Sequence, residues 1–156
     1  AAPGHTCSCS APVRALTPLF MRYGVDIVLG GHSELWERSV VAGHEKQADG
    51  GTRRHSIQFY DIGTCGDGLR GPRAGVTNPY QEFLAHRDAV EIWREAVLVD
   101  GGKHYGHLEI DITPKPAAGW RATLTPAYVF PIFDEEQNYR GFERRVYDDI
   151  VELHAD

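Results

Sequence analysis

The chain has 156 residues, of which 42% are hydrophobic and 24% charged, and its formal net charge at pH 7 is −6. This length and composition predict a single globular domain with a sizeable core and exclude a disordered chain. The acidic charge, without any run rich in Lys or Arg, argues against a nucleic-acid-binding protein, and no apolar run approaches the roughly 18 residues of a membrane span.

Residues 1–10 are rich in Gly, Ser, Cys and Pro and are expected to form a loop; the chain starts as a processed or cleaved chain would. Cys7 and Cys9 are too close for a relaxed mutual disulfide, while either could pair with Cys65 and leave one thiol over. A Cys-x-Cys zinc site is the alternative, although no second cysteine pair completes it. The disulfide is favoured over free thiols, and it indicates an extracellular or periplasmic location.

The next stretch predicts a helix that ends at Gly24. Ser10 is a suitable N-cap, and Pro18 inside the pattern is expected to kink or split the helix. The apolar residues at helical spacing are Val13, Leu16, Phe20 and Tyr23.

Residues 25–29 (VDIVL) are β-branched and aliphatic with one acid, and Gly30 and Gly31 follow. This pattern predicts a buried, parallel strand, because a strand covered on both faces loses its polar alternation. After the glycine turn come His32 and Glu34. Side chains just past the carboxyl end of such a strand lie where α/β sheets bind ligands, and both residue types bind Zn, Mn or Fe.

Residues 43–55 are polar and contain glycine, and they predict an exposed loop in which His44 and His55 are surface histidines. Residues 56–63 alternate as a strand that runs into a glycine-dense turn at 63–68. That turn either cradles a phosphate through its amides or serves only as a tight turn.

The second half of the chain predicts a short helix over 88–95 and then a β-hairpin, with a further short strand at 129–133. His104 and His107 stand three apart in the first hairpin strand, so they are expected on opposite faces and do not share a metal. Residues 134–156 are charged, with apolar residues at helical spacing, and predict a charged tail or helix.

Residues 25–39 resemble the last metal-binding motif of calcineurin-like metallophosphoesterases and are most similar to the purple acid phosphatase branch, which has Gly-His-x-His and then an aromatic residue with Glu-Arg-Ser. His32 falls on the first histidine of that motif, and 36–39 (WERS) falls on its tail. Glu34 stands where the family has its second histidine. The resemblance implies that His32 is a metal ligand and that Glu34 is a ligand by substitution. His5 matches by its spacing a loop histidine that contacts the substrate phosphate and is a candidate catalytic proton donor; a solvated loop histidine is the alternative.

The resemblance continues at 56–68, 93–96 and 106–112 and covers about residues 5–133. It implies an α/β (α+β) fold, namely the C-terminal half of a four-layer α/β/β/α metallophosphoesterase sandwich, with the strands of 56–133 in its second sheet. Residues 134–156 would lie outside that domain.

The family hydrolyses phosphate esters with two metal ions (Fe, Zn or Mn) that activate a water and clamp the phosphoryl oxygens. Its Asp-x-His and Gly-Asn-His-Asp/Glu motifs are not found in this sequence, and its Gly-Asp motif and separate histidine have no counterpart ahead of the resembling stretch. The resemblance therefore implies a phosphomonoesterase or phosphodiesterase completed by an N-terminal segment, possibly a separate chain, and predicts that this chain alone is inactive.

Two other hypotheses remain. One is a catalytically degenerate phosphoesterase-fold domain that acts as an extracellular structural or binding module, which Glu34 and the missing motifs support. The other is an unrelated secreted α+β domain in which residues 31–34 form only a strand-end turn. The metal content of the assembled protein distinguishes the enzyme from the module.

Overall fold

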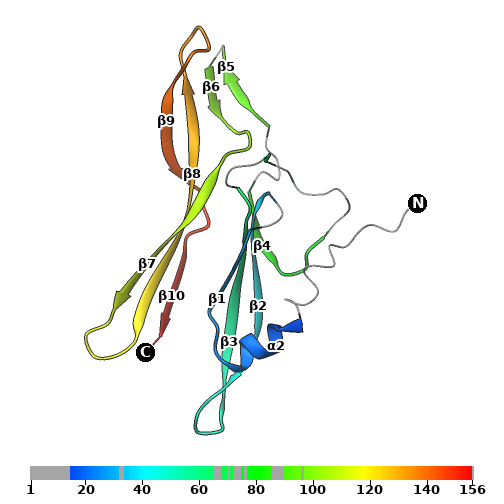
Figure 1. Cartoon of the computed structure of the whole chain (residues 1–156), viewed down its shortest axis with the longest axis vertical. Helices are drawn as coiled ribbons and strands as arrows, with labels where there is room; N and C mark the ends of the chain where they lie inside the picture. Colours follow the sequence, from blue (N-terminus) through cyan, green and yellow to red (C-terminus); the bar gives the residue numbers. More distant parts are fainter. Residues whose placement is uncertain are drawn as a thin grey trace.

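The computed structural model of the chain describes residues 15–31, 34–64, 68–69, 71, 75, 77–85, 90–95 and 97–155. These residues form one short helix, α2 (Thr17–Arg22), and ten strands, most of them in two four-stranded sheets (Figure 1). The described part is therefore mostly β with little helix, which is broadly compatible with an α+β class. No helix within these ranges is long and apolar enough to cross a membrane.

Helix α2 is shorter than the sequence pattern predicts, and residues 1–14 lie outside the described ranges. Pro18 stands in the first turn of α2, where its missing N–H leaves no helical hydrogen bond unmade. Ala15 is helical and Leu16 lies in a turn, so the helical stretch is interrupted just before Pro18, as the expected split requires. Gly24 has φ +61° and ends the helix, as predicted.

The first sheet has the strand order β1 (Ile27–Gly30), β3 (Thr52–Ile62), β2 (Trp36–Lys46) and β4 (Gln81–Leu84). Strand β1 runs parallel to β3, with Ile27 opposite Gln58, so the predicted parallel strand is confirmed. The predicted burial on both faces is not confirmed, because Leu29 is 55% exposed. Strand β1 stands at the edge of the described sheet.

Strands β2 and β3 form a long antiparallel hairpin through the segment that was expected to be a loop. Only the tip is a turn, closed by the hydrogen bond from Gln47 N to Gly51 O. His44 is exposed as predicted, but His55 is buried, at 8% exposure, so its prediction as a surface histidine is wrong. The cause is the pleat, which turns His55 towards the helix side together with Gly43, its partner in register.

The second sheet is built on β8 (Trp120–Phe133), which pairs with β7 (Gly106–Pro114), β9 (Tyr139–Val146) and β10 (Val151–Ala155), all antiparallel. The predicted hairpin is confirmed as β7 and β8, and the strand expected at 129–133 is the far end of β8. The prediction of a charged tail or helix over 134–156 is wrong, because this segment contains the strands β9 and β10, which pair with β8.

A small hairpin of β5 (Ile92–Arg94) and β6 (Val97–Asp100) replaces the helix expected over 88–95. Its turn contains Glu95 at φ +55°, a left-handed conformation that a continuing α-helix does not allow. The flanking residues are rich in Val and Ile, which favour strands.

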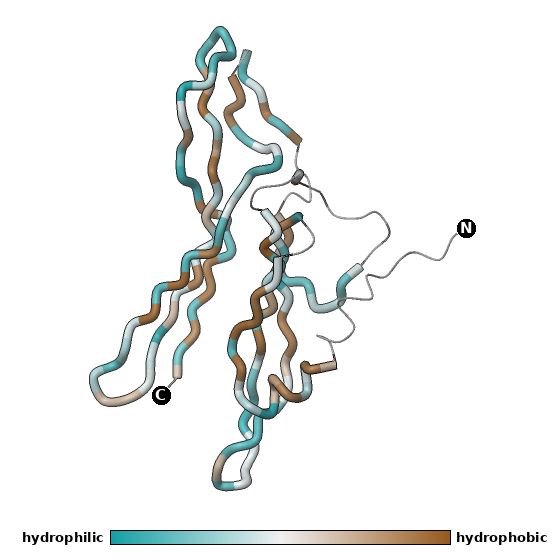
Figure 2. Tube along the Cα trace, in the orientation of Figure 1, coloured by the Kyte–Doolittle hydropathy of each residue, from teal (hydrophilic) through white to brown (hydrophobic). Residues whose placement is uncertain are grey.

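The core lies between the two sheets. Trp36 and Tyr60 from the first sheet and Leu124 from the second belong to one buried cluster. Figure 2 shows hydrophilic residues at the tips of the β2–β3 and β8–β9 hairpins, away from the strands that carry most of the apolar residues.

Helix α2 packs on the opposite face of the first sheet, where a Cβ added to Gly43 would lie 3.0 Å from the Met21 side chain (Figure 1). The described layers are therefore helix, sheet and sheet. Strands β3 and β4 belong to the first sheet, and β5 and β6 form a separate two-stranded sheet, so the expectation that the strands of 56–133 lie in the second sheet is wrong for these four strands.

Candidate functional site

The carboxyl ends of the parallel strands β1 and β3 meet at one edge of the first sheet. Gly30 is in register with Asp61, and a Cβ added to Gly31 would lie 3.3 Å from Ile62 O. The chain then turns back, and Leu35 O accepts a hydrogen bond of 3.0 Å from Gly63 N. The sequence analysis predicted the metal ligands at this end of the sheet, because α/β sheets bind ligands at the carboxyl ends of their strands.

Glu34 lies in the turn between β1 and β2, with its residue half-buried and φ at +53°. A left-handed backbone costs a non-glycine residue about 1–2 kcal/mol, and such strain gathers at functional positions. The fold therefore holds Glu34 in a backbone conformation that costs free energy, as is common at functional positions. The other candidate residues, His5 and His32, lie outside the described residues.

Two further carboxylates lie beside this turn. Glu37 of β2 is in register with Asp61 of β3, so both side chains point to the helix side of the sheet. Glu37 Oε1 accepts hydrogen bonds from Ser39 Oγ at 3.0 Å and from Asn78 Nδ2. We call Glu34, Glu37 and Asp61 the strand-end carboxylates.

Sequence reasoning did not single out Asp61 or Asn78. Asp61 could have been found from its place at the end of a strand before glycine. Asn78 carries only the signal of an Asn-Pro turn, and only the pairing of β4 with β2 brings it to Glu37.

The segment that leaves β3 is tied to the second sheet. Thr64 is 1% exposed, and its Oγ1 donates to Gly106 O at 3.1 Å, while Gly106 N donates to Thr64 O at 3.3 Å. These bonds fix the start of the glycine-dense turn, although residues 65–67 lie outside the described ranges, as do Cys7 and Cys9. The phosphate-cradling and disulfide hypotheses therefore stay predictions.

His104 and His107 are separated as expected. His104 is buried, its Nε2 is paired with Gly101 O, and its ring stacks on Tyr128 at 5.3 Å between centroids. Burial lowers the pKa of His104 below its usual value, and the hydrogen bond that the ring donates to Gly101 O opposes the shift. His107 is exposed, and its Nε2 lies 3.1 Å from Glu109 Oε1. His104 is thus a core residue of the fold.

Across the described ranges, no three His, Cys, Asp or Glu side chains form a group that could hold a metal ion. The strand-end carboxylates offer oxygen ligands but do not complete a centre by themselves. Comparison with known proteins adds no assignment: no family model matches the chain, and neither a curated protein nor a solved structure matches it.

Proposed function

We propose that this chain is the C-terminal part of a phosphoric ester hydrolase with a dinuclear metal centre, of the calcineurin-like, purple acid phosphatase-like kind. The observation that carries the proposal is Glu34, which is held in a left-handed conformation just past the carboxyl end of a parallel strand. This is the position that the sequence resemblance gives to a metal ligand.

Among the described residues, no strand pairs with the far side of β1, and this supports a second part of the protein. Asp26 O accepts from Gln58 N at 2.8 Å, so backbone groups of alternate residues, Ile27 and Leu29, point away from β3. Parallel sheets normally have both faces covered by helices, and the outward backbone groups of β1 are those that a further strand would pair with. We therefore assign further parallel strands, and the second helical layer of an α/β/β/α sandwich, to an N-terminal segment.

In the proposed assembly, bound Fe, Zn or Mn ions would supply an activated water and hold the phosphoryl oxygens. His32 and Glu34 would contribute ligands from this chain, and His5 is the proposed proton donor to the leaving group. The described carboxylates do not form a metal group by themselves, so the N-terminal segment must bring the remaining ligands. The proposal includes secretion of the protein, because the cysteine pattern favours an oxidising compartment.

The test uses the assembled protein from its natural source, or co-expressed with the segment that purifies with it. Metal content and phosphate ester hydrolysis are measured for the wild type, for His32→Ala and for the control His44→Ala, which changes an exposed histidine of β2. We expect two metals per molecule in the wild type and in the control, and loss of one metal and of activity in His32→Ala. Retention of both metals in His32→Ala would refute the ligand assignment.

The competing function is a degenerate domain that serves as a structural or binding module. It is favoured by the carboxylate of Glu34 at a position where the resembled motif has histidine. Native and denaturing mass spectrometry of one sample separates the two functions. A second polypeptide with bound metal supports the hydrolase, whereas a metal-free protein without hydrolytic activity supports the module.

A further inference from the structure

The outer edge of β10 lies in the second sheet and has no part in the proposed hydrolysis. Strand β10 pairs with β8 along its whole length, from Val151 to Ala155, without a register shift. Among the described residues, no strand pairs with its other side. An edge strand presents a row of backbone N–H and C=O groups that can pair with a further strand. This edge is therefore a candidate interaction surface.

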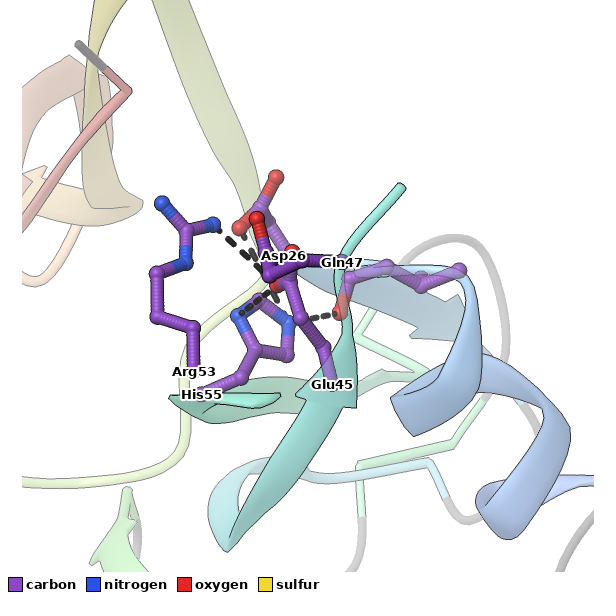
Figure 3. A network of polar contacts seen from close by, with 6 residues as sticks. Asp26, Glu45, Gln47, Arg53 and His55 are labelled. Atoms are coloured by element: carbon purple, nitrogen blue, oxygen red, sulfur yellow. Dashed lines mark hydrogen bonds and ion pairs between the residues drawn. The ribbon is translucent and has the colours of Figure 1, made fainter. Parts of the chain in front are cut away.

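The space beside the edge is a hollow. A cavity of about 250 Å³, lined on one side by residues 152–154 of β10, separates the edge from β3. Figure 3 shows the polar side chains on the β3 side, where Arg53 and His55 lie around Glu45. Arg53 Nη2 donates to Glu45 Oε2 at 3.1 Å. These side chains bond to one another within the first sheet, which leaves the edge of β10 open to another partner.

The side chains of β10 alternate between the core and solvent. Val151, Leu153 and Ala155 are half-buried, and the first two pack against the core cluster. Glu152 and His154 are exposed on the outward face. Among the described residues, neither of these two has a hydrogen-bond or ion-pair partner. The edge thus offers one carboxylate and one imidazole for contacts outside the chain.

The outward face near this edge has an acidic row and a basic row, which we define by the strand register. In the acidic row, Glu152 lies opposite Thr123 of β8, which lies opposite Asp111 of β7. In the basic row, two residues further along β10, His154 lies opposite Arg121 of β8. Members of a row share a face, because directly opposite residues of antiparallel strands point to the same side of the sheet. Two neighbouring rows of opposite charge therefore lead to the edge.

We propose that a second copy of this chain pairs with this edge, antiparallel to β10, about a two-fold axis at Leu153. The second sheets of the two copies then form one continuous sheet with an isologous interface. Glu152 of each copy lies opposite His154 of the other, so each acidic row meets a basic row. The imidazole has an N–H to donate to the carboxylate whether it is neutral or charged. On the core side, Val151 lies opposite Ala155, and the two copies of Leu153 face each other.

The charges select this register over its neighbours. An axis between two residues would place a core-side residue opposite an outward one, so the axis passes through a residue. An axis at Glu152 would set the two acidic rows side by side, and an axis at His154 the two basic rows. Like charges directly opposite each other destabilise a pair of strands, whereas opposite charges stabilise it. The axis at Leu153 joins rows of opposite charge.

Strand β9, which also pairs with β8, shows how this protein protects an edge. Half of its eight residues are charged, and its register with β8 shifts between Ile132 and Phe133. Charged side chains and irregular register discourage pairing with another chain. Strand β10 has no such shift and contains neither proline, lysine nor arginine. Its edge therefore lacks the protection that β9 has.

Sedimentation of the full chain, together with any segment that purifies with it, measures the pairing. Because β10 has only five residues, the interface is small, and we expect a reversible monomer–dimer equilibrium at micromolar to millimolar concentration. His154→Glu sets carboxylates opposite each other at both symmetric positions and should raise the dissociation constant at least about tenfold. Adding Glu152→Lys to that variant restores opposite charges and should restore the dimer. The control His44→Glu makes the same change at an exposed histidine of β2 and should leave the dissociation constant unchanged.

Hydrogen exchange of the wild type locates the contact without any variant. We expect amides of 151–155 to gain protection as the protein concentration rises, and amides of β7 to stay unchanged. The proposal is overturned by a monomer at every concentration, by equal dimerisation of wild type and His154→Glu, or by a dimer that leaves 151–155 unprotected. An N-terminal segment that protects 151–155 in a complex with one copy of this chain would also overturn it. None of these outcomes depends on metal content or hydrolysis, so they are distinct from a failure of the proposed function.

Discussion

The ion pair between Arg38 and Asp149 should be a main support of the contact between the two sheets. Arg38 of β2 donates from Nε at 2.8 Å and from Nη2 at 2.6 Å to the two oxygens of Asp149, which lies between β9 and β10. Its Nη1 also donates to Gln58 Oε1 at 3.0 Å. The two side chains are only 13% and 7% exposed.

The magnitude follows from this burial. Removing one partner of a buried pair costs about 3–5 kcal/mol, while an exposed pair contributes about 0–1 kcal/mol. Because the Arg38–Asp149 pair is nearly buried, we expect Asp149→Ala to lower the free energy of unfolding by about 3 kcal/mol and the transition temperature by about 6–12 °C. Arg38→Lys, which loses the two-pronged geometry, should cost less.

Chemical and thermal denaturation of the single and double variants measures this coupling. The double variant Arg38→Met with Asp149→Leu should recover most of the loss, because it leaves no buried charge without a partner. Glu109→Ala is the matched control, since Glu109 forms a similar bidentate pair with Arg144 at the surface and should leave the transition temperature unchanged. If Asp149→Ala is as mild as this control, the pair does not hold the sheets together.

Three other perturbations test the core, a buried hydroxyl and the strained turn. Leu124→Ala, at 0% exposure, should lower the free energy of unfolding by about 3 kcal/mol in a denaturant titration, whereas Ile112→Ala, at 66% exposure, should change it by less than about 0.5 kcal/mol. Burial raises the pKa of Tyr60 to about 12, so stability should fall as the pH rises from 10 to about 12, and Tyr60→Phe should reduce that fall in alkaline melting curves. Part of the fall should remain, because burial also raises the pKa of Tyr147. Glu34→Gly should leave the free energy of unfolding unchanged or raise it by up to about 1 kcal/mol, and it should lower the metal content of the assembled protein. The control Gln137→Gly, at φ +64°, should leave the metal content unaltered. Equal metal content in these two glycine variants would exclude Glu34 as a ligand.

The sequence predicted the elements whose pattern is local and unambiguous. The run at 25–29 predicted a parallel strand, and the alternation around Leu108 and Leu124 predicted a hairpin, because side-chain period follows directly from strand geometry. The position of Glu34 in a turn after a strand could also be predicted, since the two glycines before it allow a sharp turn.

Other elements depended on partners that are distant in sequence. Phe142 and Val146 stand at a spacing that suits a helix, yet their segment is a strand because β8 extends far enough to pair with it. Residues 43–55 look like a polar loop, but two strands that pair with each other satisfy their backbone groups and bury His55. Polar composition alone does not separate an exposed loop from a hairpin.

The strand-and-turn character of the chain and the candidate residues at the end of β1 could be predicted from the sequence. The left-handed backbone of Glu34, the register of Asp61 with Glu37 and the position of His55 between Val25 O and Glu45 became visible only in the folded chain. The physical reason is that a pattern along the chain reports the period of one element, whereas register, burial and the hydrogen-bond partners of a side chain arise from contacts between elements.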